Sequence, residues 1–458
     1  MISSSGIRGV VGAGLTPEVV ARYGAAFGTY LSARYSEDRG YVVVGRDSRT
    51  SGEILADAVL AGLRAAGWDA RDLGIVPTPT ALLATGDDAS AVGALLITAS
   101  HNPVEWNGLK LGSPDGRFVS PADGLEVQRA FESGPEYGDW SRLGARQAVP
   151  GAIARHIERI LSLRVLDPGR IAGRRLRVAV DCVHGAGGLI MPALLEQLGC
   201  EVIGLGLTAD GRFPRNPEPT AENLGELGAI VRESGADLGM AVDPDVDRLS
   251  LVDGSGRPVG EDWTLALAVE LVARRTPGPV VTNLSSSLCI QDAAQRAGVQ
   301  FSQAPVGEAN VVEAMLEEGA VIGGEGNGGV ILPELHLTRD APLAAALVLQ
   351  LLTDRETDLQ SLLADWPGYQ IAKRKAPRPD GSLEGIFEAV SRSAPAGASE
   401  DRLDGLRLEW PDNRWLHIRP SGTEPILRVI GEAESEADAV RLVDEVVASL
   451  HGDVDNGA

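Results

Sequence analysis

Apolar runs of the β type recur along the chain, and three of them lead into a short polar loop. The runs occupy residues 92–98, 237–242 and 320–324, and the loops follow at residues 99–103, 243–248 and 325–329. One loop carries a serine, the second a cluster of carboxylates, and the third an acid and an amide among glycines. Ligands of open α/β sheets bind outside the carboxyl ends of the strands. The pattern therefore predicts three related domains that share one site.

The same order of elements precedes each loop. A strand, a turn, an amphipathic helix, a glycine and a second strand begin near residues 41, 177 and 279. A further helix comes before the strand that feeds the loop, and residues 221–234 are its best example. Strand–helix–strand units of this kind form mainly parallel sheets. We therefore expect an α/β fold with three tandem related α/β/α domains.

The chain beyond residue 367 has a different pattern. It predicts a helix at 383–393, strands at 406–410, 415–418 and 426–430, and a helix at 436–450. Such an order is typical of a small α+β domain. The predicted domains are residues 1–148, 149–254, 255–367 and 368–458.

The charge balance narrows the choice of partner. The chain has 64 acidic and 41 basic residues, a formal net charge of −23, which disfavours nucleic acid and anionic membranes. A small anionic substrate is compatible, because a pocket can concentrate positive charge locally. The longest apolar stretch, 343–352, is too short to span a bilayer.

Two further observations indicate the cellular compartment in which the protein folds. Three widely spaced cysteines fit neither a zinc pattern nor a disulfide framework. The first residues lack the basic and apolar regions of a signal peptide. Both observations favour a reducing cytoplasm.

The carboxylate loop predicts a metal site. Asp243, Asp245 and Asp247 alternate, so in extended backbone they project to one side. Carboxylates about 4 Å apart repel by several kcal/mol at a moderate dielectric, and a bound cation relieves this. Oxygen ligands without His or Cys favour Mg²⁺. An EF-hand is excluded, since Arg248 and Gly254 stand where Gly and Glu are required. A solvated acidic turn is the alternative, but the apolar strand before the loop favours burial.

Ser100 ends another buried strand. It could be a turn serine, because Asn102 and Pro103 form a turn signal. No Gly-x-Ser-x-Gly elbow surrounds it. With metal ligands available from the second loop, phosphoryl chemistry fits better. Lys110 follows ten residues later and is one of only three lysines, a residue type that can lose its proton where Arg cannot.

Further polar groups could hold a phosphorylated sugar. Glu325 and Asn327 suit sugar hydroxyls, since their oxygens accept and the amide donates. Arg8 lies between glycines, which let a backbone approach a ligand. Arg46 to Arg49 could be a structural ion pair. A phosphate cradle, or alternatively an ordinary turn, is expected at Arg419, Ser421, Gly422 and Thr423.

Three motifs, in this order, resemble the α-D-phosphohexomutase family. They are Thr-Ala-Ser-His-Asn-Pro at 98–103, Asp-x-Asp-x-Asp-Arg at 243–248, and Arg-Pro-Ser-Gly-Thr at 419–423. The resemblance extends from Gly6 to about residue 450. The family includes phosphoglucomutases, phosphomannomutases and phosphoglucosamine mutases. The resemblance implies four domains around a central cleft, with one loop from each.

The resemblance also implies roles for individual residues. Ser100 would carry a phosphoryl group, and Mg²⁺ would bind the three aspartates and a phosphoserine oxygen. Hexose 6-phosphate and hexose 1-phosphate would interconvert through a bisphosphorylated sugar, which is both intermediate and activator. Arg8, His101 and Lys110 would lie near the transferring group, with Lys110 as candidate general base. Substrate contacts would come from Arg248, Glu325, Asn327, Arg419, Ser421, Gly422 and Thr423.

The third loop departs from the commonest family pattern. Many relatives have Ser where Asn327 stands and His where Gly329 stands. The form Gly-Glu-Gly-Asn-Gly-Gly, with Pro-Val-Gly-Glu at 305–308, looks most like the phosphoglucosamine mutase branch. We therefore expect glucosamine phosphate as substrate, with mannose or glucose phosphate as the alternative, and a monomer or homodimer.

Two other functions are weighed against a mutase. A non-catalytic sugar-phosphate binding protein would be favoured by a degraded serine or aspartate motif, and both motifs are intact. A Mg²⁺-dependent phosphatase would need water at the site, which an enclosed cleft excludes.

Overall fold

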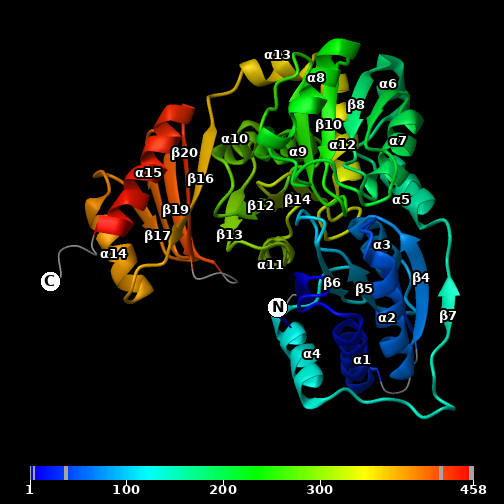
Figure 1. Ribbon diagram of the computed structural model, residues 1–458. Helices are drawn as coiled ribbons and strands as arrows, with labels where there is room; N and C mark the ends of the chain where they lie inside the picture. The colour runs from blue at the N-terminus through cyan, green and yellow to red at the C-terminus, as the bar shows by residue number, and fades with distance from the viewer. Residues whose placement is uncertain (1, 4–5, 36–39, 422–425, 453–458) are drawn as a thin grey trace.

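The computed structural model describes residues 2–3, 6–35, 40–421 and 426–452. Within these ranges the strands form four sheets. Figure 1 shows the four sheets, each with its helices, following one another in an arc. We call them units I to IV in chain order.

Unit I contains a seven-stranded mixed sheet. Its order is β1 (Ile2–Ser3), β2 (Gly6–Val10), β6 (Trp106–Gly112), β5 (Ala91–Ile97), β3 (Tyr41–Arg46), β4 (Asp69–Ile75) and β7 (Arg146–Ala148). Its helices are α1 (Pro17–Arg34), α2 (Gly52–Ala65), α3 (Thr78–Gly86) and α4 (Pro121–Ser133). Helix α1 begins where the Thr16 side chain accepts from the Val19 amide and proline fills the first position.

Units II and III each contain a four-stranded sheet. Unit II has the order β11 (Leu249–Asp253), β10 (Leu238–Val242), β8 (Arg177–Asp181) and β9 (Glu201–Leu205). Unit III has the order β13 (Phe301–Ala304), β12 (Val280–Asn283), β14 (Ile322–Glu325) and β15 (Gly329–Ile331). The helices of unit II are α5 (Ala152–Leu161), α6 (Pro168–Arg174), α7 (Gly187–Gln197) and α8 (Gly225–Ser234). Those of unit III are α9 (Asp262–Arg275), α10 (Leu288–Ala297), α11 (Glu308–Glu318), α12 (Ala341–Arg355) and α13 (Leu359–Ala364).

The three polar loops are hairpin connections. Each strand that feeds a loop pairs antiparallel with the next strand, as β5 with β6, β10 with β11 and β14 with β15. The other pairs in units II and III are parallel. The expected parallel pairing is therefore correct for the strand–helix–strand parts of the sheets. The antiparallel strand that follows each loop was not expected. The helix expected at 221–234 is a 3-10 turn, Ala221–Asn223, followed by α8.

Units II and III share one hydrophobic core. Helix α12 packs against α9 of its own unit and also against α5, α6 and α7 of unit II. Buried residues from both sheets, such as Met240 and Ile322, join Leu347 of α12 in one apolar cluster. This explains the apolar stretch at 343–352, because a helix that is apolar all round is a buried helix. Among the described residues, none of the helices is long and apolar enough to cross a membrane.

A polar junction fastens units I, II and III together. Asp340, the N-cap of α12, accepts at Oδ2 from His156 Nε2 at 2.7 Å and from His336 Nε2 at 2.8 Å. His156 Nδ1 lies 2.8 Å from the Thr80 hydroxyl of α3. These are hydrogen-bond distances. Burial alone would raise the pKa of Asp340, but the two imidazoles more than offset it, so its pKa lies well below the usual range.

Unit IV contains an antiparallel sheet of five strands. The order is β16 (Gln370–Pro377), β20 (Ile426–Ala433), β19 (Arg414–Pro420), β18 (Leu406–Trp410) and β17 (Ser399–Asp401), with helices α14 (Leu383–Ser393) and α15 (Glu436–Gly452). It is fastened to unit III by His417 Nδ1, 2.8 Å from Ser285 Oγ, and by Glu432, which accepts from the Leu288 amide at 2.9 Å.

Candidate active site

The carboxylate loop is a buried acidic cluster. Asp243, Asp245 and Asp247 are fully buried, and each offers an oxygen within 4.8 Å of the others. Val246 between them has φ 64°, a conformation that β-branched residues rarely adopt. Burial raises the pKa of Asp243 well above its usual range, and Asp247 and Asp245 add to this. The loop thus places three carboxyl groups where water is excluded, and in the absence of a cation the ionised form of Asp243 is disfavoured.

The loop fits a hard divalent cation. Asp245 Oδ1 and Asp247 Oδ1 are buried and have no hydrogen-bond partner among the described residues. A buried carboxylate oxygen without a partner is costly unless a cation satisfies it. An all-oxygen donor set is the set that Mg²⁺ prefers.

Lys110 and Thr78 of unit I hold the middle aspartate. Lys110 Nζ donates to Asp245 Oδ2 at 2.9 Å and lies 3.7 Å from Asp247 Oδ2, while Thr78 Oγ1 donates to Asp245 Oδ2 at 2.8 Å. Burial alone would lower the pKa of Lys110, but the two aspartates more than offset it, so its pKa is raised. Lys110 is therefore held here as an ammonium that neutralises the cluster.

Ser100 of unit I meets the carboxylate loop of unit II. Its Oγ donates to Asp243 Oδ2 at 3.1 Å, and its amide donates to Thr98 Oγ1 at 2.8 Å. Ser100 has φ 51°, in the sparsely populated left-handed region. His101 Nδ1 lies 3.4 Å from Ser100 Oγ. The pKa of His101 is lowered to about 2, mainly by burial and further by Arg248 and Arg8, so its imidazole is neutral at pH 7.

A buried arginine shapes the serine loop. Arg49 is fully buried, and its guanidinium donates to the carbonyl oxygens of Ser100 and Asn102 at 2.6 Å each and of Pro103 at 2.6 Å. Its Nε donates to Asp47 Oδ2 at 3.0 Å. The sequence suggested only a structural ion pair here, and the pair extends into the backbone of the loop.

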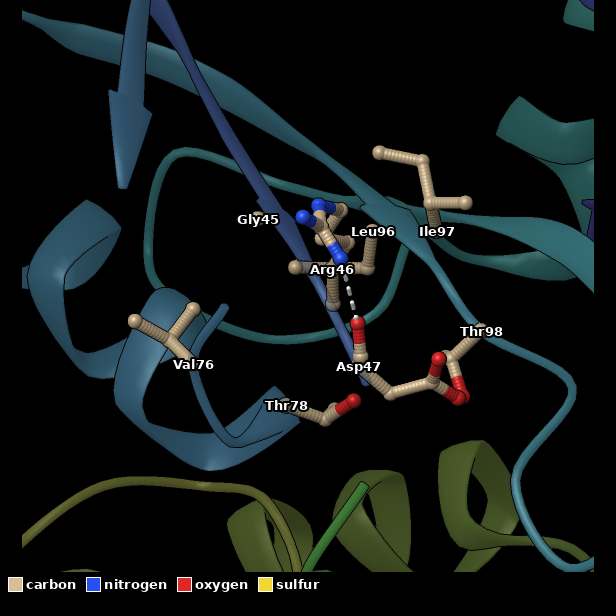
Figure 2. Close-up of a pocket in the computed structure, with 8 residues that line it drawn as sticks. All are labelled: Gly45, Arg46, Asp47, Val76, Thr78, Leu96, Ile97 and Thr98. Carbon is tan, nitrogen blue, oxygen red and sulfur yellow. Dashed lines mark hydrogen bonds between the residues drawn. The ribbon is translucent and has the colours of Figure 1, made fainter. Parts of the chain in front are cut away.

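Asp47 joins two strand ends. Figure 2 shows the ends of β3 and β5, where Asp47 and Thr98 lie next to each other. Thr98 Oγ1 donates to Asp47 Oδ2 at 2.7 Å. This hydrogen bond therefore fastens the end of β5, which leads to Ser100, to the end of β3.

The third loop is connected to the metal loop by a residue that the sequence reasoning missed. Arg339 Nη1 donates to Glu325 Oε2 at 2.8 Å, and its Nη2 donates to Asp247 Oδ2 at 2.6 Å. Glu325 Oε1 accepts from Asn283 Nδ2 at 2.9 Å. Asn327 Oδ1 is buried with no hydrogen-bond partner among the described residues. The only sequence signal for Arg339 was a charged pair directly before the apolar run of α12.

The remaining predicted residues lie on three units. Arg8 Nη1 is 3.4 Å from Asn102 Oδ1 in the serine loop. Arg248 Nη1 donates to Glu218 Oε1 at 3.1 Å. Arg419 and Ser421 lie at the end of β19 in unit IV, and the Ser421 amide donates to the Ile426 carbonyl at 2.9 Å. Gly422 and Thr423 lie outside the described residues.

Known proteins resemble the chain along its whole length. The family described as phosphoglucomutase/phosphomannomutase matches in four successive parts: α/β/α domain I at 2–138, domain II at 154–256, domain III at 260–369 and the C-terminal domain at 372–449. This chain belongs to the phosphoglucomutase/phosphomannomutase family. The resemblance to α-D-phosphohexomutases and the four-domain architecture are thereby confirmed, and the chain is an enzyme of the phosphohexomutase class.

Individual members of the phosphoglucomutase/phosphomannomutase family resemble it closely. A protein named probable phosphoglucosamine mutase from Methanopyrus kandleri is 40% identical over 447 residues, which cover 97% of this chain and 96% of that protein. A phosphoglucomutase/phosphomannomutase from Thermococcus kodakarensis is 38% identical over 96% of both chains. The crystal structure of a family protein from Burkholderia thailandensis superposes with a TM-score of 0.85 at 28% identity, covering 100% of this chain and 99% of that one.

Proposed function

We propose that this phosphohexomutase interconverts glucosamine 6-phosphate and glucosamine 1-phosphate through a phosphorylated Ser100 and a bisphosphorylated sugar. The observation that carries the proposal is the contact between Ser100 Oγ and Asp243 Oδ2 at 3.1 Å, next to two buried carboxylate oxygens that have no hydrogen-bond partner among the described residues. A phosphoryl group on Ser100 would stand beside a site suited to a divalent cation.

The reaction consists of two balanced transfers. In the first, a sugar hydroxyl oxygen bonds to the phosphorus on Ser100, the bond from phosphorus to Ser100 Oγ breaks, and the hydroxyl proton passes by way of a base to Oγ. In the second, Ser100 Oγ bonds to the phosphorus of the other phosphate of the bisphosphorylated sugar, the bond from that phosphorus to the sugar oxygen breaks, and the Ser100 hydroxyl proton passes by way of the base to the sugar oxygen. The sugar must turn between the two transfers while water stays out.

Charged and polar side chains surround Ser100. Asp243, Asp245 and Asp247 would hold Mg²⁺, which when bound neutralises charge on a phosphoryl group. The ammonium of Lys110 and the guanidinium of Arg8 carry positive charge near Ser100. The neutral imidazole of His101 lies 3.4 Å from Ser100 Oγ, within reach of a hydrogen bond to it, but a pKa lowered to about 2 makes it a weak proton acceptor. Lys110 as general base stays a prediction, because its contacts here favour the protonated form.

The sugar and the second phosphate would contact units II, III and IV. Glu325, Asn327 and Arg248 would meet the hydroxyl groups, and Arg419, Ser421, Gly422 and Thr423 would hold the phosphate that is not transferred. The buried Asn327 Oδ1 supports this, since a sugar hydroxyl or an amine is a donor that could satisfy it. The phosphoglucosamine mutase name of the Methanopyrus relative supports glucosamine.

The experiment is a comparison of kcat/KM for the 6-phosphates of glucosamine, mannose and glucose with Mg²⁺ present. Glucosamine 6-phosphate should exceed the others by at least tenfold. A preference for mannose or glucose would retain the mechanism and reassign the substrate. That outcome is the second candidate function, supported by the phosphoglucomutase/phosphomannomutase name of the Thermococcus relative.

Intact mass spectrometry provides the test of mechanism. The purified protein, incubated with a hexose 1,6-bisphosphate, should carry one phosphoryl mass, located on Ser100 by peptide fragmentation. Release of inorganic phosphate without isomerised sugar would instead identify a phosphatase. Binding of sugar phosphate by calorimetry without any product would identify a binding protein.

A further inference from the structure

One arginine stands between two parts of the site that come from different units. Arg339 is 7% exposed and lies directly before α12. Its Nη2 contacts Asp247 Oδ2 at 2.6 Å, its Nη1 contacts Glu325 Oε2 at 2.8 Å, and its Nε contacts Glu308 Oε2 at 3.0 Å. Three carboxylates from three segments therefore share one planar cation.

The first of these contacts determines which oxygen Asp247 offers to a ligand. Arg339 occupies Oδ2, and Oδ1 remains buried without a hydrogen-bond partner among the described residues. The second contact fixes the rotation of the Glu325 carboxylate, whose Oε1 is held by Asn283 Nδ2 at 2.9 Å. A single guanidinium thus orients one proposed metal ligand and one proposed sugar contact.

A glycine makes room for this arrangement. A Cβ atom at Gly329 would lie 2.2 Å from Arg339 Cδ and 2.8 Å from Cγ. These are mid-chain atoms of a side chain whose end is held by three carboxylates, so they cannot move aside without losing those contacts. The close approach of Arg339 therefore accounts for the glycine at position 329 of this chain.

Lysine could not replace this arginine. Its ammonium is a point charge on a flexible stem, whereas the guanidinium presents donors in a fixed fork. A lysine at 339 would retain the charge and lose the defined geometry between the carboxylates.

We propose that Arg339 is a positioning residue that makes the metal loop and the sugar loop one unit. It acts through Asp247 on metal affinity and through Glu325 on sugar affinity. The missing side chain of Gly329 leaves the space that Arg339 occupies. The inference rests on the proposed function for the role of Glu325. The effect of Arg339 on metal affinity can be measured without any turnover.

The test uses two variants that reach Arg339 by different routes. Arg339→Lys retains the charge, and Gly329→Ala displaces the side chain without altering any charge. Because a Cβ at Gly329 would also lie 3.1 Å from Asn327 Oδ1, the affinity for Mn²⁺ is the decisive readout of the second variant. For each, Mn²⁺ affinity is measured on the metal-free protein by electron paramagnetic resonance, and KM and kcat are measured with each hexose phosphate. We expect the Kd for Mn²⁺ to rise by about tenfold or more, as is common when a group that orients a metal ligand is lost, and KM to rise more than kcat falls.

Matched controls separate positioning from a general effect on folding. Arg174→Lys alters another arginine, which donates to the carbonyl oxygens of Leu352 at 3.0 Å and Thr357 at 3.2 Å. Gly225→Ala adds a Cβ where no atom lies within 4 Å. Both should leave the Kd for Mn²⁺ and KM within twofold of the unmodified protein.

Two outcomes would overturn the inference. One is a Kd for Mn²⁺ and a KM within twofold of the unmodified protein in both variants. The other is an equal change in the controls. If Arg339→Lys does not fold, Gly329→Ala alone decides. If the unmodified protein binds Mn²⁺ but converts none of the hexose phosphates, the proposed function fails, and Mn²⁺ affinity with calorimetric sugar-phosphate binding still decides the role of Arg339.

Discussion

Arg49 is expected to determine the stability of the loop that carries Ser100. Replacing it by methionine keeps most of the side-chain volume and removes all donors. Asp47 would then be a buried carboxylate without its ion pair. The carbonyl oxygens of Ser100, Asn102, Pro103 and Trp106 would also lose their shared donor.

The magnitude follows from these contacts. Removing one partner of a buried ion pair costs about 3–5 kcal/mol. Buried acceptors that lose a donor add about 1 kcal/mol or more, although water can reach the more exposed of these carbonyls. We expect Arg49→Met to destabilise the loop by about 4–6 kcal/mol. Arg49→Lys keeps the charge but has fewer donors, so about half of that loss is expected.

Hydrogen exchange read by mass spectrometry measures this change locally. A loss of about 4 kcal/mol corresponds to roughly thousandfold faster exchange of amides in residues 94–111, provided that the loop opens locally. Arg215→Met is the control, since Arg215 pairs with Asp181 at 2.6 Å in unit II and, in the part of the chain that the structure describes, donates no hydrogen bond to the loop. Exchange within threefold of the unmodified protein in Arg49→Met would refute the reasoning.

Three further predictions concern the serine, the metal and the polar junction. The Ser100→Ala variant should carry no added phosphoryl mass and show no mutase turnover. Its Tm should stay within about 2 °C of the unmodified protein, since the lost hydrogen bond is worth about 1 kcal/mol. Turnover in this variant would exclude the phosphoserine route. Mg²⁺ at a hundredfold excess over its Kd should stabilise the protein by about 2.7 kcal/mol, and Asp245→Asn should remove most of this effect in thermal unfolding. Asp340→Asn should cost about 2 kcal/mol at pH 7. Urea titrations give the difference in unfolding free energy between the variant and the unmodified protein. Because the folded-state pKa of Asp340 is depressed, this difference should be constant at neutral pH and shrink as pH falls below about 4, the ordinary pKa of aspartate. A difference that grows on acidification would contradict the assignment.

The chemistry of the loops could be predicted because it depends on local pattern. Alternating aspartates after an apolar strand indicate a buried acidic cluster, and Asp243, Asp245 and Asp247 are one. The carboxyl ends of strands collect ligand-binding loops, and Ser100 does meet Asp243. Both inferences needed only the order of residues at the carboxyl end of each strand.

The connecting residues could not be predicted because their partners come from distant parts of the chain. Arg49 acts on carbonyl oxygens about fifty residues away, and Arg339 acts on Asp247 of another unit. No local spacing records such contacts. Strand β6 was missed for another reason, since two glycines and an asparagine give it low β-propensity.

Helix α12 has a consequence for how the three repeats can exist. It belongs to unit III by sequence, yet it covers α5, α6 and α7 of unit II. A fragment that stops at residue 256 would leave that apolar surface bare, and we expect it to aggregate rather than fold. The repeats are therefore no longer separable modules, and units II and III must fold and unfold together. A recombinant protein that uses either of these two units would have to contain both.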